Sequence, residues 1–364
     1  MKNSIKTVID NQKKYFQSKN TFEISKRKNY LIKLRKEIRK NESEIELALF
    51  KDLGKSEGES YLTEIHFVYA ELKIAINNID KWAKRKSVRS SLLNFPSSDY
   101  IIAQPFGNTL HISPWNYPFQ LSIAPLIGAI AAGNTVVLKP SEYSKNTSNI
   151  LEKIISNVFE EELVKVFLGG PEVAKELLNL KWDYIFFTGS VSVGKIVAKQ
   201  AAINLTPTTL ELGGKNPCVV DETASIKVTA KRIVWGKFIN CGQTCIAPDF
   251  LIVNKKIKEK LTLEIINQIK LIYGNNPEKS DSYGRIISNK HINFLSSLLK
   301  DQKIIYGGKI DEKSRYFEPT LVEVSDFNSD LMEQEIFGPI LPIYEYDNFD
   351  EIDQIIYKCK NPLA

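Results

Sequence analysis

The segment 240–245 carries two cysteines that could act as nucleophiles, Cys241 and Cys245, directly after a predicted helix. Cys245 has polar neighbours and a glycine close by, which favours a reactive thiol, whereas Cys218 fits the pattern of a passive apolar core residue. Attack on a substrate requires the thiolate, which is a minor form of an unperturbed cysteine at pH 7. None of the three histidines has neighbours that mark it as the base of a Cys–His enzyme.

Glu211 is an acid flanked by leucines at the end of a predicted core strand. A carboxylate in apolar surroundings is costly unless it is functional or paired. Desolvation would raise its pKa towards the range of a general base. A structural ion pair with Lys215 is the alternative, because many perturbed carboxylates are structural. For Glu211, the sequence favours the role of general base over the structural ion pair.

The glycine-containing segment 188–195 follows a predicted strand and opens a predicted helix, a setting in which backbone N–H groups bind phosphate. It nearly matches the P-loop pattern, but Ile196 stands where a hydroxyl would bind magnesium, which argues against nucleotide triphosphate hydrolysis. The segment does not fit G-x-G-x-x-G either. A pyrophosphate contact and a plain tight turn are equally supported by these glycines.

The length and composition are those of an ordinary globular protein. The 364 residues exceed what one core usually supports, so two domains are expected. The net charge of +6 is only mildly basic and predicts a solvated helix face rather than nucleic-acid binding. Four cysteines without C-x-x-C spacing indicate a reducing, cytoplasmic setting without a zinc site. We find no signal peptide, and the longest apolar stretch, 121–132, is too short to span a bilayer.

Strands and helices alternate over most of the chain after a helical stretch of about 86 residues. Residues 100–103 and 109–112 are expected to form two short strands joined as a hairpin around Pro105-Phe106-Gly107. From Ser113 the alternation predicts a parallel sheet with helices on both faces, and it restarts after Leu210. The further expected strands are 135–138, 164–168, 183–187, 217–220, 250–253 and one near 341–344.

Six motifs stand in a specific order and spacing: Pro114-Trp115-Asn116-Tyr117-Pro118-Phe119, Leu138-Lys139-Pro140-Ser141-Glu142, Phe187-Thr188-Gly189-Ser190, Leu210-Glu211-Leu212-Gly213-Gly214-Lys215, Gly242-Gln243-Thr244-Cys245 and Glu335-Ile336-Phe337-Gly338-Pro339. Together they resemble the aldehyde dehydrogenase superfamily, over essentially the whole chain. The similarity is greatest to its class 3 branch, which includes fatty-aldehyde dehydrogenases. The resemblance implies an α/β fold of two three-layer α/β/α Rossmann-type domains with a small β-hairpin oligomerisation element.

The same resemblance implies a dinucleotide-binding domain over residues 1–210, with a hairpin arm at about 87–112, and a catalytic domain over 211–364. Family members continue past the Asn-Pro-Leu-Ala end of this sequence, so the catalytic domain is expected to lack its C-terminal end, as a fragment or as a natural truncation. A complete chain is expected to form a homodimer.

By resemblance, Cys245 is the nucleophile and Glu211 the general base. Asn116, together with the backbone N–H of Cys245, becomes the donor that holds the oxyanion. No metal is implied.

The implied cofactor is NAD or NADP. Lys139 and Glu142 resemble the family's adenosine-ribose contacts, and Glu335 its contact to the nicotinamide ribose. The remaining implied cofactor-binding residues are Trp115, Gly189, Ser190, Gly194, Leu212 and Phe337.

The implied reaction is the oxidation of a small-molecule aldehyde to a carboxylic acid through a cysteine thiohemiacetal and a thioester. Two other functions stay open. A chain without the last part of the catalytic domain could bind a dinucleotide or a partner without turnover. An acyl-transferring semialdehyde enzyme is disfavoured, because CoA-acylating relatives generally lack the glutamate found at Glu211.

Overall fold

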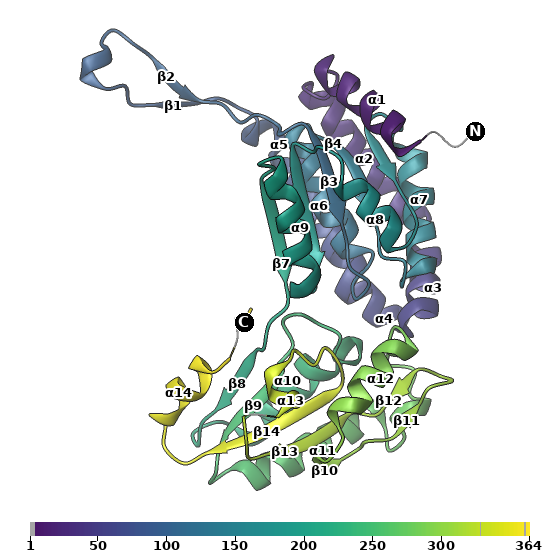
Figure 1. Ribbon diagram of the computed structural model, residues 1–364, viewed down its shortest axis with the longest axis vertical. Helices are drawn as coiled ribbons and strands as arrows, with labels where there is room; N and C mark the ends of the chain where they lie inside the picture. Colours follow the sequence, from purple (N-terminus) through teal and green to yellow (C-terminus); the bar gives the residue numbers. More distant parts are fainter. Residues whose placement is uncertain (1–3, 328, 360–361) are drawn as a thin grey trace. The chain divides into compact units, whose positions relative to one another are not determined.

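The computed structural model describes residues 4–327, 329–359 and 362–364. The chain divides into two compact units (Figure 1). Unit 1 comprises the residues up to Ala48 together with Ser60–Glu211, and unit 2 comprises Leu49–Glu59 together with Leu212–Ala364.

The segment 49–59 belongs to unit 2, whereas the boundaries expected from the sequence place it in the N-terminal domain. It packs with unit 2, where the Arg315 guanidinium donates to the Asp52 carbonyl at 2.7 Å. The backbone N–H of Arg285 likewise donates to the carbonyl of Leu53 at 2.6 Å. These contacts join positions more than 200 residues apart, which local periodicity does not predict.

Unit 1 is built on a five-stranded sheet in the order β5-β4-β3-β6-β7. Its strands are β3 (Asn108–Ile112), β4 (Thr135–Lys139), β5 (Val164–Val166), β6 (Tyr184–Gly189) and β7 (Thr208–Leu212). The central strand β3 pairs in parallel with both β4 and β6, so that Leu110 lies opposite Val137 and Ile185. The strand order therefore reverses at β3, as in doubly wound dinucleotide-binding folds.

Helices cover this sheet: α6 packs on β3 and β4, α7 on β5, and α9 on β6 (Figure 1). The helices of unit 1 are α1 (Ile5–Gln17), α2 (Ile24–Lys40), α5 (His66–Trp82), α6 (Gln120–Ala132), α7 (Lys145–Val158), α8 (Pro171–Leu178) and α9 (Val191–Ile203). Helix α3 (Glu42–Leu53) and the short α4 (Glu57–Ser60) cross the unit boundaries, and a π-helical turn η1 (Tyr61–Ile65) precedes α5.

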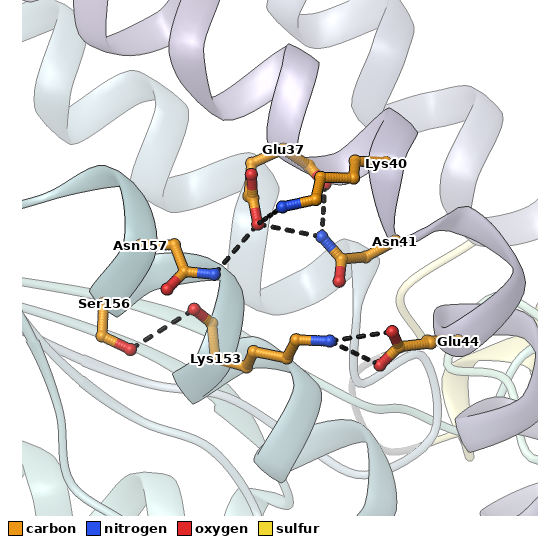
Figure 2. Close-up of polar contacts among 7 residues, drawn as sticks. All are labelled: Glu37, Lys40, Asn41, Glu44, Lys153, Ser156 and Asn157. Carbon is orange, nitrogen blue, oxygen red and sulfur yellow. Dashed lines mark hydrogen bonds and ion pairs between the residues drawn. The ribbon is translucent and has the colours of Figure 1, made fainter.

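Polar contacts join the end of α2 and the start of α3 to α7 (Figure 2). The Glu37 carboxylate accepts from the Asn157 amide at 3.0 Å, and Lys153 donates to both oxygens of Glu44 at 2.8 and 2.7 Å. Lys153 and Glu44 are largely solvated, and exposed pairs of this kind contribute only about 0–1 kcal/mol to stability. Burial of the apolar helix faces, such as Leu31, Leu34 and Ile38, therefore dominates here.

The hairpin arm is real, but its strands differ from those expected. It is formed by β1 (Lys86–Val88) and β2 (Asp99–Ile101), which pair antiparallel with Ser87 opposite Tyr100. The predicted partner strand at 109–112 is instead the centre of the unit 1 sheet. Its residues Asn108, Thr109, Leu110 and His111 are buried, which is typical of a central parallel strand and unlike an exposed hairpin.

Unit 2 contains a second five-stranded sheet in the order β10-β13-β14-β9-β8. The strands β8 (Pro217–Val220), β9 (Phe250–Asn254), β14 (Ile340–Tyr346) and β13 (Thr320–Val324) run parallel, and β10 (Lys303–Tyr306) adds an antiparallel edge. Neither β10 nor β13 was expected from the sequence. A separate small pair consists of β11 (Ile310–Asp311) and β12 (Tyr316–Phe317).

The helices of unit 2 are α10 (Ile226–Phe238), α11 (Lys258–Tyr273), α12 (Asn289–Leu298), α13 (Asp330–Glu333) and α14 (Glu351–Tyr357), with short 3-10 turns η3 (Ile239–Gly242) and η4 (Pro277–Lys279). Helices α10 and α11 pack against each other. One continuous core of buried residues joins these helices to the sheet. None of the helices in the described part of the chain is long and apolar enough to cross a membrane.

Candidate active site

Asn116 lies in the loop 113–119 that connects β3 to α6, which we call the Asn116 loop. Its side chain is only 3% exposed, and the neighbouring Trp115 is half-buried. The loop begins on the sheet, because the Ser113 N–H donates to the Lys139 carbonyl at 3.1 Å. The Ser113 and Ser122 hydroxyls are 2.6 Å apart, which ties the loop start to the first turn of α6.

The carboxyl ends of parallel strands β3, β4 and β6 share one edge of the unit 1 sheet, and three predicted segments follow these ends. Lys139 is the last residue of β4 and is buried, and its amine lies 3.0 Å from the Glu142 carboxylate and 2.9 Å from the Pro140 carbonyl. Gly189 is the last residue of β6. In doubly wound sheets, ligands bind at this edge where the strand order reverses.

The predicted glycine turn is the N-terminus of α9. Ser190 caps this helix by accepting from the Val193 N–H at 3.4 Å, and the Gly194 N–H donates to the Ser190 carbonyl at 2.9 Å. A Cβ on Gly189 would lie 2.6 Å from Cζ of Phe187, so the backbone approaches that ring more closely than a larger residue allows.

Glu211 lies near the end of β7 and is exposed, so the expected desolvation of its carboxylate is wrong. The alternative, a structural pair with Lys215, is also wrong. The amine of Lys215 lies 2.5 Å from the Asp249 carboxylate inside unit 2, and both side chains are nearly inaccessible. The strand end of Glu211 faces solvent, which local apolar neighbours do not reveal.

Cys245 lies on the connection between η3 and β9 and is half-buried. The carbonyl of Cys245 accepts from the Asn216 amide at 2.7 Å. The buried side chain of Gln243 stabilises the connection between η3 and β9 by hydrogen bonds. Its amide donates to the carbonyls of Asn240 at 2.9 Å and Arg285 at 3.0 Å, and its carbonyl accepts from the Ile287 N–H at 2.9 Å.

The two neighbouring thiols have different surroundings. Cys241 is fully buried in the core of unit 2, and this burial raises its pKa to about 12. Its backbone has a φ of 56°, and Gly242 follows with a φ of 75° against the backbone of Gly338. The left-handed turn directs Cys241 into the core and leaves Cys245 at the half-buried position.

Glu335 lies against the Gly-Gly pair that follows Leu212. A Cβ on Gly213 would overlap the Glu335 carboxylate, and the Gly214 backbone N–H hydrogen-bonds to that carboxylate. Burial, together with the nearby negative charge of Asp249, raises the pKa of Glu335 to about 7. The structure thus brings Glu335 against the glycines that follow the predicted residue Leu212, although the two segments are far apart in the sequence.

Lys215 and Asp249 hold the segment that carries Glu335, and no role for this pair was predicted from the sequence. The Lys215 amine donates to the carbonyls of Leu331 at 2.7 Å and Gln334 at 2.9 Å. The Asp249 carboxylate accepts from the Ile336 N–H at 3.1 Å. A buried ion pair could have been predicted from Asp249 itself, because this charged residue stands directly before an apolar strand.

Phe337 has a φ of 52°, an uncommon conformation for a bulky residue. His291 holds it there, because its Nε2 lies 2.8 Å from the Phe337 carbonyl and burial lowers the pKa of the imidazole. The neutral imidazole donates to this carbonyl through Nε2. His291 is therefore a structural support of the predicted Phe337, a role that was not predicted from the sequence.

A family model described as the aldehyde dehydrogenase family matches residues 1–361. The 4,4'-diaponeurosporen-aldehyde dehydrogenase of Staphylococcus aureus is 45% identical over 364 residues, which are 100% of this chain and 79% of that protein. Aldehyde dehydrogenase family 3 member B2 of Mus musculus is 46% identical over 328 residues, which are 90% of this chain and 68% of that protein.

Solved structures of aldehyde dehydrogenases share this fold. The substrate-bound AldH of Staphylococcus aureus superposes with a TM-score of 0.97 at 45% identity, over 99% of this chain and 79% of that one. The glyceraldehyde-3-phosphate dehydrogenase GapN of Methanocaldococcus jannaschii, solved with NADP, gives a TM-score of 0.84 at 27% identity, over 96% and 77% of the two chains.

The family model and the named relatives identify an oxidoreductase that acts on aldehydes. The α/β fold predicted from the motifs is confirmed. The chain belongs to the aldehyde dehydrogenase family. Relatives named as family 3 members are 42–46% identical to it, in accord with the predicted class 3 resemblance.

Proposed function

We propose that this chain oxidises an aldehyde to a carboxylic acid with NAD or NADP, and that Cys245 is the nucleophile. The observation that carries the proposal is the contrast between the two thiols of one loop. Cys241 is sealed in the core with a raised pKa, whereas Cys245 is half-buried on a connection that Gln243 and Asn216 hold. We assign dinucleotide binding to unit 1 and catalysis to unit 2.

The edge of the unit 1 sheet fits a dinucleotide. The proposed contacts are Lys139 and Glu142 for the adenosine ribose and the α9 N-terminus, at Gly189 to Gly194, for the pyrophosphate. In unit 2, Glu335 would accept from the nicotinamide ribose, with Phe337 near the ring and Leu212 beside it. Trp115 is the last of the proposed cofactor-binding residues. Two relatives support this choice: GapN was solved with NADP, and a betaine aldehyde dehydrogenase of Staphylococcus aureus with NAD+.

In the proposed mechanism, the Cys245 thiolate adds to the aldehyde carbonyl and forms a thiohemiacetal. The carbonyl oxygen becomes an oxyanion that the Asn116 amide and the Cys245 backbone N–H stabilise. Each donor of this kind contributes about 10²–10³ in rate. The buried, held position of Asn116 supports this role, because preorganised donors need no rearrangement during the reaction.

The bound dinucleotide supplies the hydride acceptor. Departure of a hydride from the thiohemiacetal carbon leaves a thioester on Cys245. Glu211 then takes a proton from a water molecule that attacks the thioester, which releases the carboxylic acid and restores the thiol. Its exposed position supports this role, because the carboxylate is accessible to water.

For the complete protein we propose a cytoplasmic homodimer that acts on a small-molecule aldehyde without a nucleic-acid partner. The free state of all four cysteines supports a reducing compartment. The arm supports association with a second copy, because Leu92, Leu93 and Phe95 at its tip are 87%, 95% and 82% exposed.

A panel of aldehydes, read by the absorbance of the reduced cofactor, tests the proposal on matched variants. Cys245→Ala should lose aldehyde oxidation by more than about 1,000-fold while dinucleotide affinity stays within a few-fold. Cys241→Ser is the control and should retain most activity. Equal activity of wild type and Cys245→Ala would contradict the assignment of the nucleophile.

A further inference from the structure

Glu64 is a fully buried carboxylate outside the residues assigned so far. It lies in the π-helical turn η1 and has an exposed fraction of 0%. Burying a charge is costly unless hydrogen bonds compensate it. Single π-helical turns are rare, and they occur often at functional sites.

The partners of Glu64 are the first backbone groups of α6. One carboxylate oxygen accepts from the Phe119 N–H at 2.8 Å and from the Gln120 N–H at 3.1 Å. The first N–H groups of a helix have no partner within the helix, and the positive end of the helix dipole favours an anion there. The next N–H, of Leu121, already donates to the Tyr117 carbonyl at 2.9 Å. Glu64 therefore determines where α6 begins.

The Asn116 loop is thereby held at both ends. The sheet holds Ser113 through the Lys139 carbonyl, and Glu64 holds Phe119. Only two residues, Tyr117 and Pro118, separate Asn116 from the held end. Pro118 also has a fixed φ, and its carbonyl accepts from the Ser122 hydroxyl at 2.6 Å, so the short connection has little freedom.

We infer that Glu64 is a positioning residue of the reaction: its carboxylate fixes the start of α6 and thereby the place of the Asn116 amide. The inference rests on the proposed role of Asn116 as the oxyanion donor. A displacement of about 1 Å at a reacting group can lower a rate 100-fold, so loss of the carboxylate should act mainly on kcat and little on KM.

A double-mutant cycle on the full chain tests the coupling. The hydride-transfer rate is measured in single turnovers for wild type, Glu64→Ala, Asn116→Ala and the double variant. Asn116→Ala should slow the reaction about 10²–10³-fold, and Glu64→Ala about 10- to 100-fold. The double variant should be no slower than Asn116→Ala alone, because Glu64 acts through Asn116.

Gln12→Ala is the matched control. Gln12 is also fully buried in unit 1, and its amide donates to two backbone carbonyls, of Val136 and Glu161, at 3.1 Å each. Its side-chain carbonyl accepts from the Asn108 amide, at the opposite end of β3 from the Asn116 loop. Gln12→Ala should lower stability but leave the hydride-transfer rate of the folded enzyme within a few-fold of wild type.

Each outcome decides a separate question. A Glu64→Ala effect that is equally large with and without Asn116 overturns the inference, and so does an unchanged rate in Glu64→Ala. If Asn116→Ala itself leaves the rate unchanged, the proposed role of Asn116 fails, and the inference fails with it. Should Glu64→Ala not fold, Glu64→Gln keeps the volume and one acceptor. Glu64→Gln should then lower the rate by a smaller factor than Glu64→Ala, and only when Asn116 is present. A rate loss from Glu64→Gln that persists in the Asn116→Ala variant overturns the inference.

Discussion

Both units hold a segment with predicted site residues by means of a buried charged side chain, but the charges have opposite signs. In unit 1 the Glu64 carboxylate accepts from two N–H groups at the start of α6, next to the Asn116 loop. In unit 2 the Lys215 ammonium donates to two carbonyls around the short helix α13, next to Glu335. Each charge matches the backbone groups that a helix end leaves without partners.

The difference lies in what else surrounds these charges. The Asp249 carboxylate lies 2.5 Å from the Lys215 amine and 4.0 Å from the Lys237 amine, and its charge also acts on Glu335. Burial lowers the pKa of Lys237 to about 8 and raises that of Glu335 to about 7. Unit 2 therefore carries groups that titrate close to neutral pH, and pH changes should act on the site through this unit.

The largest expected effect comes from removing the cation of unit 2. Lys215→Met leaves the Asp249 carboxylate buried without its nearest partner and removes two hydrogen bonds to the Glu335 segment. Loss of one member of a buried pair lowers the free energy of unfolding by about 3–5 kcal/mol. Denaturant unfolding of the variant measures this loss.

Lys303→Met is the control for that experiment, because Lys303 pairs with Glu323 while its side chain is 77% exposed. An exposed pair contributes about 0–1 kcal/mol. Equal stability losses in Lys215→Met and Lys303→Met would contradict the view that the buried pair supports the Glu335 segment.

A smaller effect is expected for the pH dependence that Glu335 causes. Because its pKa is raised from 4.5 to about 7 in the folded state, the folded protein binds more protons than the unfolded chain between these pH values. Its contribution to stability therefore falls as the pH rises through this window. The groups facing the carboxylate are Asp249, Lys237, Lys215 and the Gly214 N–H.

Glu335→Gln should remove this decline. Relative to wild type, the variant should gain stability from pH 5 to pH 7.5, by up to about 3 kcal/mol at the upper end. Chemical unfolding at a series of pH values measures the difference, and pH 7.5 is the upper limit because Lys237 titrates above it. Parallel pH profiles of the two proteins would count against the raised pKa of Glu335.

The smallest effect is expected at the edge of the unit 1 sheet, where the Glu142 carboxylate is partly exposed to solvent. Glu142 is a carboxylate 3.0 Å from the Lys139 amine, and its negative charge should repel the 2′-phosphate of NADP. Glu142→Gln should therefore narrow any preference for NAD over NADP by a few-fold. Steady-state kinetics with both cofactors measure the ratio, with the exposed Glu152→Gln as the control, and an unchanged ratio in Glu142→Gln would argue against this contact.

The sequence predicted the elements whose signals are local. Apolar, β-branched runs predicted β4, β8 and β9, and motif order predicted the family. The pairing of strands was predicted less well, because residues 109–112 form the centre of a sheet rather than one side of a hairpin. Antiparallel β10, with lysine and exposed isoleucines, lacks the pattern of a buried strand.

At the site, the motifs identified which residues to consider, but long-range contacts determine their surroundings. Glu211 is exposed although leucines flank it, and Lys215 pairs with Asp249, 34 positions away, rather than with Glu211. Glu64 bonds a helix start 55 positions later. The burial of Glu64 could have been predicted from its spacing. It stands four residues before Val68 and so continues the buried stripe of α5 towards the N-terminus, where an acidic residue is unusual.

In the proposed reaction, Cys245 carries the acyl group and Glu211 activates the water that releases it. Rapid mixing of Glu211→Gln with aldehyde and cofactor, followed by mass spectrometry of the quenched enzyme, tests these two roles most directly. Hydride transfer needs the thiolate and the oxyanion donors, whereas release needs an activated water. We expect a burst near one equivalent of reduced cofactor, followed by a stall with the acyl mass on Cys245. No burst and an unmodified Cys245 would contradict it, because Glu211 would then act first, on the thiol.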